Sequence, residues 1–396
     1  MQKKDIIKLL KIQGVLVKKI EFFENSLELY IETNSKYHVC PSCKCRTKHT
    51  HDYRNQKIQH IFIGQLQSYI ILRKRRYICD HCGKKFYEKY DFVQKYFRKS
   101  NAVFESICSD LKQLKNLKTI ADDNNVSIPT VTKYMHYAVA LNHGYNITLP
   151  KRIGIDEFKG NCNGTKYQFH IYDLDTGKTI DIVKERTYNF LETYFSKFSL
   201  QERLNVKLVS MDLYAPFKRV IKDKFPSATI VADTFHYTRI AMNPLDELRL
   251  NLWRNTKGKE KYYFKNMKHA LMKDISKATQ KDTEKLLYAF ELSPILKEAY
   301  KLKQQFLDIK KLSTYEEKEN AFKKWLFDAE CSTIKEFKSS IKTLRQWHEY
   351  ISNSFKYNVS NGPVEGKNNL IKTLKRISFG FKNLNNFRAR ILLCEL

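Results

Sequence analysis

The sequence predicts a multidomain α/β protein, in which an N-terminal zinc-binding module and a helix-turn-helix precede a mixed α/β core with a long all-helical insertion. Two Cys-x-x-Cys pairs lie near the amino terminus, and strand-like and helix-like segments alternate after residue 150. A charged, aromatic-rich stretch with few turn residues then follows. The expected divisions are the zinc module 1–95, the helix-turn-helix 96–149, the first part of the core 150–236, the insertion 237–355 and the C-terminal helices of the core 356–396.

The composition indicates folded domains that bind a polyanion. Of 396 residues, 42% are hydrophobic and 13% aromatic, which suffices for the cores of two or three domains. The formal net charge of +30 exceeds what solubility requires, so nucleic acid is the expected partner and a lysine-rich solvated surface is the alternative. No apolar run approaches the roughly 18 residues that cross a bilayer, and the first residues do not resemble a signal peptide. We therefore expect a cytoplasmic protein without a membrane partner.

Cys40, Cys43, Cys79 and Cys82 form two matched pairs that predict a structural zinc site. A two-residue gap lets both thiolates of a pair reach one tetrahedral ion, and four thiolates leave no open position for catalysis. Disulfides are disfavoured in the cytosol, which supports metal binding. Neighbouring residues that could replace a ligand, but that we expect to be bystanders, are Cys45, His49, His51 and His81.

The residues between the cysteine pairs predict a β-hairpin. Segments 58–63 and 68–72 are strand-like, with a turn at Gly64, and the second strand runs into a basic stretch beside the zinc. Such a stretch can be a solvated edge that blocks strand pairing. Because the metal would hold the ribbon rigid, we favour contacts with DNA phosphates. The residues concerned are Arg73, Lys74, Arg75 and Arg76.

Residues 117–134 have the internal spacing of a helix-turn-helix. Ala121 is small where two helices would cross, Asn125 tolerates a left-handed turn, and Val131 would be the apolar contact of the second helix. An ordinary helical hairpin is the alternative. The residues expected on or near the face that enters a DNA major groove are Thr130, Thr132, Lys133 and His136.

From residue 153 the predicted order is strand, strand, strand, helix, strand, helix, strand, which is that of a ribonuclease-H-like sheet. Such a sheet carries acids at the ends of its first and fourth strands. Asp156 and Asp212 occupy these two positions in the runs 153–158 and 206–212. Glu157 should point to the opposite side of its strand, so we do not expect it to share a metal with Asp156.

A third acid, Glu365, lies on a predicted helix far along the chain. On a wheel of about 100° per residue, Asn369, Lys372 and Arg376 fall within about 40° of Glu365. The opposite side carries apolar residues, namely Leu370, Leu374 and Ile377. A lone glutamate on a basic helix is usually an ion-pair partner, but the two strand-end acids upstream favour a shared site. Three carboxylates suit two divalent ions such as Mg²⁺ or Mn²⁺.

Taken together, these motifs resemble the bacterial insertion-sequence transposases of the ISL-three family, within the Asp-Asp-Glu superfamily. The resemblance covers nearly the whole chain. Besides the cysteine pairs and the helix-turn-helix, it is carried by the segments 154–158, 211–217, 232–236 and 361–366. It implies a core that cuts and rejoins DNA with two magnesium ions held by Asp156, Asp212 and Glu365.

The family resemblance also implies partners and accessory residues. The partners would be double-stranded DNA, as terminal inverted repeats and target, and further copies of the chain in a homodimer or higher oligomer. We expect Lys372 and Arg376 to contact DNA. Asp233 and His236 resemble an Asp-x-x-His element, in which Asp233 is a rival metal ligand and His236 contacts the scissile phosphate or caps a helix. A catalytically inactive DNA-binding regulator and a nuclease without strand transfer are the rival functions.

Overall fold

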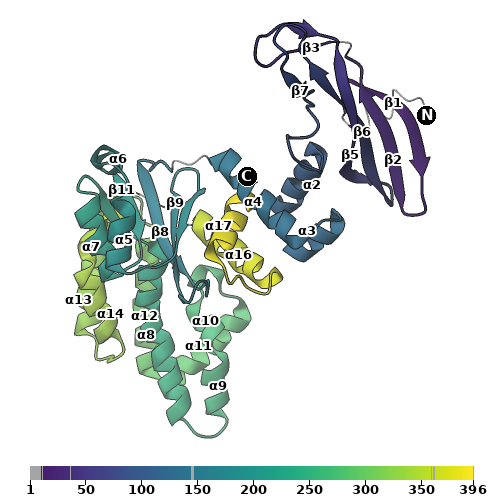
Figure 1. The fold of residues 1–396 in the computed structure, drawn as a ribbon. Helices are drawn as coiled ribbons and strands as arrows, with labels where there is room; N and C mark the ends of the chain where they lie inside the picture. Colours follow the sequence, from purple (N-terminus) through teal and green to yellow (C-terminus); the bar gives the residue numbers. More distant parts are fainter. Residues whose placement is uncertain are drawn as a thin grey trace. The chain divides into compact units, whose positions relative to one another are not determined.

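The computed structural model describes most of the 396-residue chain. The described residues are 10, 12–35, 37–143, 147–357, 359 and 362–395, without the side chains of residues 143 and 362–365. They form two compact units, one of Met1–Asn146 with Ile371–Leu396 and one of Ile147–Leu370 (Figure 1). No described helix is both long enough and apolar enough to cross a membrane.

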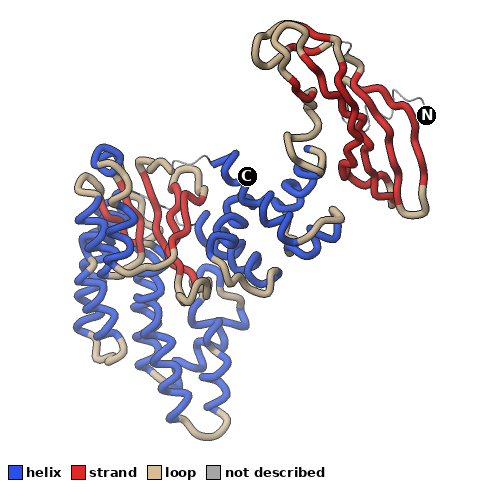
Figure 2. Tube along the Cα trace, viewed as in Figure 1, coloured by secondary structure: helices blue, strands red, loops and turns tan. Residues whose placement is uncertain are grey.

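The first unit contains a sheet of long antiparallel and parallel strands (Figure 2). The order is β1 (Val15–Phe22), β2 (Ser26–Thr33), β6 (Leu66–Ile78) and β5 (Thr50–Ile63), and β7 (Lys85–Tyr87) also pairs with β6. Strands β5 and β6 are the predicted hairpin. Gly64 lies in its turn with φ of 61°, a left-handed conformation that glycine adopts at little cost. Buried Leu29, Ile58 and Ile70 fill the core beneath the sheet.

Four helices of the first unit share a second core. They are α2 (Asn101–Lys112), α3 (Leu117–Asp123), α4 (Ile128–His143) and the C-terminal α17 (Leu384–Cys394). Ala121 and Val131 are buried between α3 and α4, and Asn125 has a φ of 48° in the turn. Arg390 of α17 is fully buried, and its guanidinium donates to the carbonyls of Gln113 (2.6 Å) and Lys115 (2.9 Å). Helix α17 thereby closes the end of α2.

The second unit is built on a mixed sheet in the order β10-β9-β8-β11-β12. Its strands are β8 (Arg152–Phe158), β9 (Gln168–Asp173), β10 (Thr179–Val183), β11 (Leu208–Met211) and β12 (Thr229–Ala232). Strands β8, β11 and β12 are parallel, whereas β9 is antiparallel to both β8 and β10. The carboxyl ends of β8, β10, β11 and β12 therefore lie at one edge. The predicted mixed α/β core is confirmed.

The two faces of this sheet differ in chemistry. Ile155 and Phe169 belong to a hydrophobic core with the helices α5 (Tyr188–Phe195) and α7 (Ala215–Lys224); the short α6 (Leu200–Asn205) precedes β11. Gly154 faces the other way, and a Cβ atom there would overlap the ring of Tyr172. Asp156, two residues further along β8, shares that second face. Glycine at position 154 thus lets Tyr172 pack beside the acid.

The stretch after β12 is helical, as its composition predicts. Helix α8 (Thr234–Asn255) begins directly after β12, and Asn353 of a later helix donates from Nδ2 to the carbonyl of Ile230 in β12 (2.8 Å). The helices that follow α8, up to the one that carries Asn353, are α9 (Glu260–Asn266), α10 (Lys268–Met272), α11 (Gln280–Leu292), α12 (Pro294–Ile309), α13 (Tyr315–Cys331), α14 (Phe337–Gln346) and α15 (His348–Tyr357). A short 3-10 helix lies at Ile275–Lys277. Helix α16 (Gly362–Ile377) follows.

Candidate functional site

The four predicted zinc ligands converge in the first unit. The Sγ atoms of Cys40 and Cys82 are 3.6 Å apart, and those of Cys43 and Cys79 are 3.4 Å apart. A tetrahedral zinc ion with Zn–S bonds of about 2.3 Å separates its sulfurs by slightly less than 4 Å. All four ligand atoms lie within 4.8 Å of one another, so the donor set fits zinc.

The two cysteine turns have the same backbone design. The N–H of Lys44 donates to the carbonyl of Cys40 (3.0 Å), and the N–H of Gly83 donates to the carbonyl of Cys79 (2.9 Å). Lys44 and Gly83 both have positive φ, 63° and 69°. Each turn therefore aims its two thiolates at the same point. Cys45 and His81 cluster with Cys43 beside this site, whereas His49 and His51 pair with Asp80 and Asp52.

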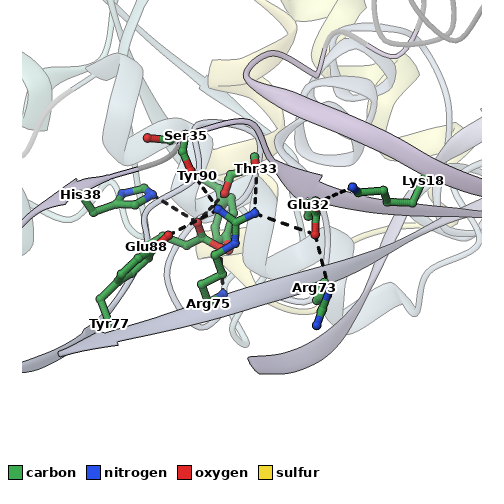
Figure 3. Close-up of polar contacts among 10 residues, drawn as sticks. All are labelled: Lys18, Glu32, Thr33, Ser35, His38, Arg73, Arg75, Tyr77, Glu88 and Tyr90. Carbon is green, nitrogen blue, oxygen red and sulfur yellow. Dashed lines mark hydrogen bonds and ion pairs between the residues drawn. The ribbon is translucent and has the colours of Figure 1, made fainter. Parts of the chain in front are cut away.

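The basic residues of β6 have different environments. Figure 3 shows Arg75 within the sheet, where its guanidinium donates to the carbonyls of Ser35 (2.9 Å) and Thr33 (3.2 Å). Arg73 is more exposed, and its guanidinium carbon lies 4.0 Å from the ring centre of Tyr53. Lys74 lies over Tyr87 at 5.2 Å.

Arg76 pairs with Asp52 at 3.4 Å. Arg75 packs into the sheet more closely than Arg73: its side chain is 16% exposed, against 56% for Arg73.

The predicted DNA-reading residues lie along α4. Lys133 and His136 are exposed, and Thr130 and Thr132 are partly exposed. Lys133 lies over the ring of Phe97 at 5.3 Å. His136 Nε2 is 2.8 Å from Oδ1 of Asn386 in α17, so part of this face contacts the C-terminal helix.

Strand-end acids converge at the carboxyl edge of the mixed sheet. Asp156 lies on β8, Asp212 follows β11 and Asp233 follows β12. His236, in the first turn of α8, places Nδ1 2.6 Å from Oδ1 of Asp212 and 3.0 Å from Oδ2 of Asp233. Asp233 also caps α8, because its side chain accepts from the N–H of Phe235 (2.8 Å). The structure thus brings the Asp-x-x-His element to the two predicted strand-end acids.

Burial and charge perturb the titration of this cluster. Burial, together with the nearby Asp156 carboxylate, raises the pKa of Asp212 to about 6. Burial alone would lower the pKa of His236, but hydrogen bonds to Asp212 and Asp233 raise it to about 10. At neutral pH the imidazolium of His236 therefore holds the two carboxylates together. Perturbed groups that face one another in this way are typical of functional sites.

Asn368 of α16 contacts the acid cluster directly. Its Nδ2 donates to Oδ2 of Asp156 (2.6 Å), while the N–H of Glu157 donates to Oδ1 (2.6 Å). Burial raises the pKa of Asp156, and the hydrogen bond from Asn368 offsets part of this rise. The sequence analysis missed Asn368; its spacing of three residues from Glu365, one helical turn, was the available signal.

The side chain of Glu365 lies outside the described residues, although its backbone belongs to α16. Lys372 and Arg376 are exposed on the same helix. Its buried side consists of Ile371 and Leu374, whereas Leu370 and Ile377 are partly buried.

Comparison with known families decides the identity. A family of transposases, the DDE transposases of ISL3 elements, matches residues 153–391. The chain belongs to this family. The zinc finger of the transposases IS204, IS1001, IS1096 and IS1165 matches residues 36–82, which contain all four zinc-ligand cysteines. The resemblance inferred from the sequence motifs is confirmed: the protein is an insertion-sequence DDE transposase with an N-terminal zinc finger.

Curated relatives agree with this assignment. The transposase for insertion sequence element IS1001 of Bordetella parapertussis is 21% identical over an alignment of 392 positions that covers 96% of this chain and 95% of the relative. The transposase for IS1557 of Mycobacterium tuberculosis is 24% identical over an alignment of 256 positions that covers 59% of this chain and 57% of the relative. A Lactococcus lactis protein named ATP-dependent protease is 31% identical over 134 residues, 34% of this chain and 38% of the relative.

The DDE transposase family implies divalent metal at the acid site, and the residues present fit it. Asp212 and Asp233 offer carboxylate oxygens within 4.8 Å of one another, His236 pairs with both, and the carboxylate of Asp156 lies beside them. Carboxylate oxygens are the ligands that Mg²⁺ and Mn²⁺ prefer. The transposase therefore combines a thiolate site suited to zinc with an oxygen-rich site suited to a hard cation.

Proposed function

We propose that this transposase binds the terminal inverted repeats of its element and catalyses metal-dependent DNA cleavage and strand transfer. Asp156, Asp212 and Glu365 would hold two Mg²⁺ or Mn²⁺ ions. The observation that carries the proposal is the convergence of Asp156 and Asp212 at one sheet edge, with α16 packed against Asp156 through Asn368. Glu365 lies one turn before Asn368 on that helix.

Two divalent ions would supply an activated nucleophile and charge for the leaving oxygen. The chain's own residues organise the site. In buried surroundings each carboxylate would interact more strongly with a bound cation than it would in water. Asn368 and the Glu157 N–H fix the orientation of Asp156. His236 balances the charges of Asp212 and Asp233, and its partly exposed side chain would contact a phosphate of the DNA.

Sequence-specific binding would reside in the first unit. We assign α3 and α4 as a helix-turn-helix, supported by buried Ala121 and Val131 and by the left-handed turn at Asn125. Gln59 of β5 donates to the carbonyl of Asn125 (2.9 Å), which fixes the turn against the zinc-bearing sheet. The base-reading residues would be Thr130, Thr132, Lys133 and His136.

Phosphate contacts would come from the exposed Arg73 and the partly exposed Lys74 and Arg76, with Arg75 acting mainly through the sheet. Lys372 and Arg376 on α16 would add further contacts. Because an element has two ends, we also propose that a homodimer or higher oligomer assembles on DNA.

The test is incubation of the full-length protein with Mg²⁺ and a labelled duplex that carries one end of the element and its flanking DNA. We expect a cut at the element boundary and joining of the freed end to a second duplex. Cuts without joined products would indicate a nuclease, and specific binding without cuts would indicate a regulator. Either result would contradict the proposal.

A further inference from the structure

A cluster of aromatic and basic side chains lies beside the acid site, at the same edge of the sheet. Arg186 follows the carboxyl end of β10 and pairs with Glu157, the neighbour of Asp156. Its guanidinium carbon is 4.6 Å from the ring centre of Tyr167 and 5.1 Å from that of Tyr214, two residues after Asp212. Arg186 therefore connects the loops that leave β8, β10 and β11.

The β8–β9 loop, residues 159–167, has hydrogen bonds within itself and to the segment that follows β10. Asn161 and Asn163 have left-handed φ angles of 58° and 49°. The hydroxyl of Thr165 donates to the carbonyl of Lys184 (3.1 Å), which ties this loop to the segment that carries Arg186. The side chain of Lys166 is exposed at the end of the loop. A surface fixed in this way loses little conformational entropy when it binds a ligand.

The charge and ring content of this surface match nucleic acid. Lys166 Nζ lies 5.3 Å from the ring centre of Tyr167, and Lys184 and Arg186 are partly exposed nearby. A phosphodiester that approaches three carboxylates is repelled, and adjacent cations offset that repulsion. Aromatic faces can stack on bases or sugars. Arg186 and Lys184 also pair with Glu157 and Glu185, but basic side chains that alternate with tyrosines suit a DNA strand better than an acidic peptide, which needs no stacking.

We infer that Lys166, Tyr167, Arg186 and Tyr214, here called the Arg186 surface, bind the DNA strand immediately beside the scissile phosphate. Arg186 contacts a phosphate, and Tyr167 packs against the adjoining sugar or base. The inference rests on the proposed function and adds the residues that seat the DNA. Lys166, Tyr167 and Arg186 lie outside the segments that carry the family resemblance, and Tyr214 lies in segment 211–217 together with Asp212.

Arg152 provides a matched comparison. It lies at the start of β8, at the opposite edge of the sheet, and pairs with Asp175 at 2.9 Å. Both arginines have similar exposure, 39% for Arg152 and 32% for Arg186, and each faces a carboxylate. If Arg186 serves only the ion pair, the two substitutions to Gln should have equal effects on DNA.

The first experiment compares Arg186→Gln, Arg152→Gln and the wild-type full chain on the labelled element-end duplex. We expect Arg186→Gln to raise the KM for DNA about tenfold, as the loss of a charge-assisted contact does, and to reduce the slope of log affinity against log salt by about one. Arg186→Lys should recover part of the affinity. Arg152→Gln should match the wild type. Equal KM values and slopes for the two Gln variants would overturn the inference.

A second experiment does not depend on cleavage or on the stability of Arg186→Gln. A photoreactive phenylalanine analogue replaces Tyr167 or, as a control, the exposed Thr176 in the turn at the opposite edge. Irradiation with labelled duplex in the absence of divalent metal should crosslink position 167, within a few nucleotides of the element boundary, and not position 176. Equal crosslinking would overturn the inference even if the wild type cuts DNA. Crosslinking at position 167 by a protein that never cuts would contradict only the proposed function.

Discussion

Asn368 donates a 2.6 Å hydrogen bond to Asp156 across 212 positions of sequence, and so fixes one carboxylate of the acid site from helix α16. Asn368→Ala should lower kcat for cleavage by about 10- to 100-fold and weaken Mn²⁺ binding, because residues that orient metal ligands have effects of that size. Mn²⁺ affinity can be measured by calorimetry on the full-length protein, independently of activity.

Asn353→Ala is the control for Asn368. Asn353 makes a comparable amide contact from a helix to the sheet, but to the carbonyl of Ile230 rather than to an acid. Both variants should lose similar stability, and only Asn368→Ala should lose metal affinity. Similar metal affinities for the two variants would contradict the positioning role and leave Asn368 with a structural role alone.

Zinc should stabilise the first unit. Cys79 follows β6 and lies in the turn before β7, so Cys79→Ser should release the metal and disrupt the pairing of β7 with β6. Elemental analysis should give about one zinc per chain for the wild type and close to none for this variant. Cys331→Ser, at an exposed cysteine of α13, should retain the zinc. Well-folded wild-type protein without zinc would contradict the assignment.

Arg75 and Arg73, two residues apart on β6, should respond differently to substitution. Arg75→Ala should reduce the free energy of unfolding by about 1–3 kcal/mol, because two backbone carbonyls lose their charged donor. Arg73→Ala should leave stability nearly unchanged, weaken binding to specific and random DNA alike, and reduce the salt slope by about one. Denaturant titration and gel shifts would separate these effects; the reverse pattern would refute the assignment.

Acid should destabilise the first unit through His60. Burial lowers the pKa of this histidine from 6.5 to about 4, so the unfolded chain takes up a proton first and stability is lost as pH falls from about 6.5 to about 4. His60→Gln should remove this part of the pH dependence, a difference of about 2–3 kcal/mol between the ends of the range. Urea titrations at several pH values test this; parallel curves for both proteins would contradict it.

The sequence was informative where local chemistry decides the structure. The cysteine spacing determines a thiolate site with little help from the rest of the chain, and the alternation after residue 150 predicts the mixed sheet because its strands are short and apolar. Ala121, Asn125 and Val131 lie where the spacing places them, since the packing of two adjacent helices is a local matter.

Contacts distant in sequence were not predictable. The wheel of α16 grouped Asn369 with Glu365, but only the packing on the sheet shows that Asn368 meets Asp156. Strand alternation puts Arg73 and Arg75 on one face of β6. Arg75 is the one that lies within the sheet, because its guanidinium donates to the carbonyls of Thr33 and Ser35. Likewise, nothing in the sequence pattern predicts that Arg390 donates to carbonyls at the end of α2.

The most direct test of the central claim is cleavage of a labelled element end by Asp156→Asn, Asp212→Asn and Glu365→Gln, with DNA binding measured in parallel. Each substitution keeps the shape of the side chain and removes a charge that divalent ions need. Cleavage should fall by several orders of magnitude while DNA affinity stays the same or rises slightly, since a negative charge near phosphate is gone. A Glu365→Gln protein that cuts at the normal rate would contradict the assignment and make Asp233 the next candidate for the third ligand.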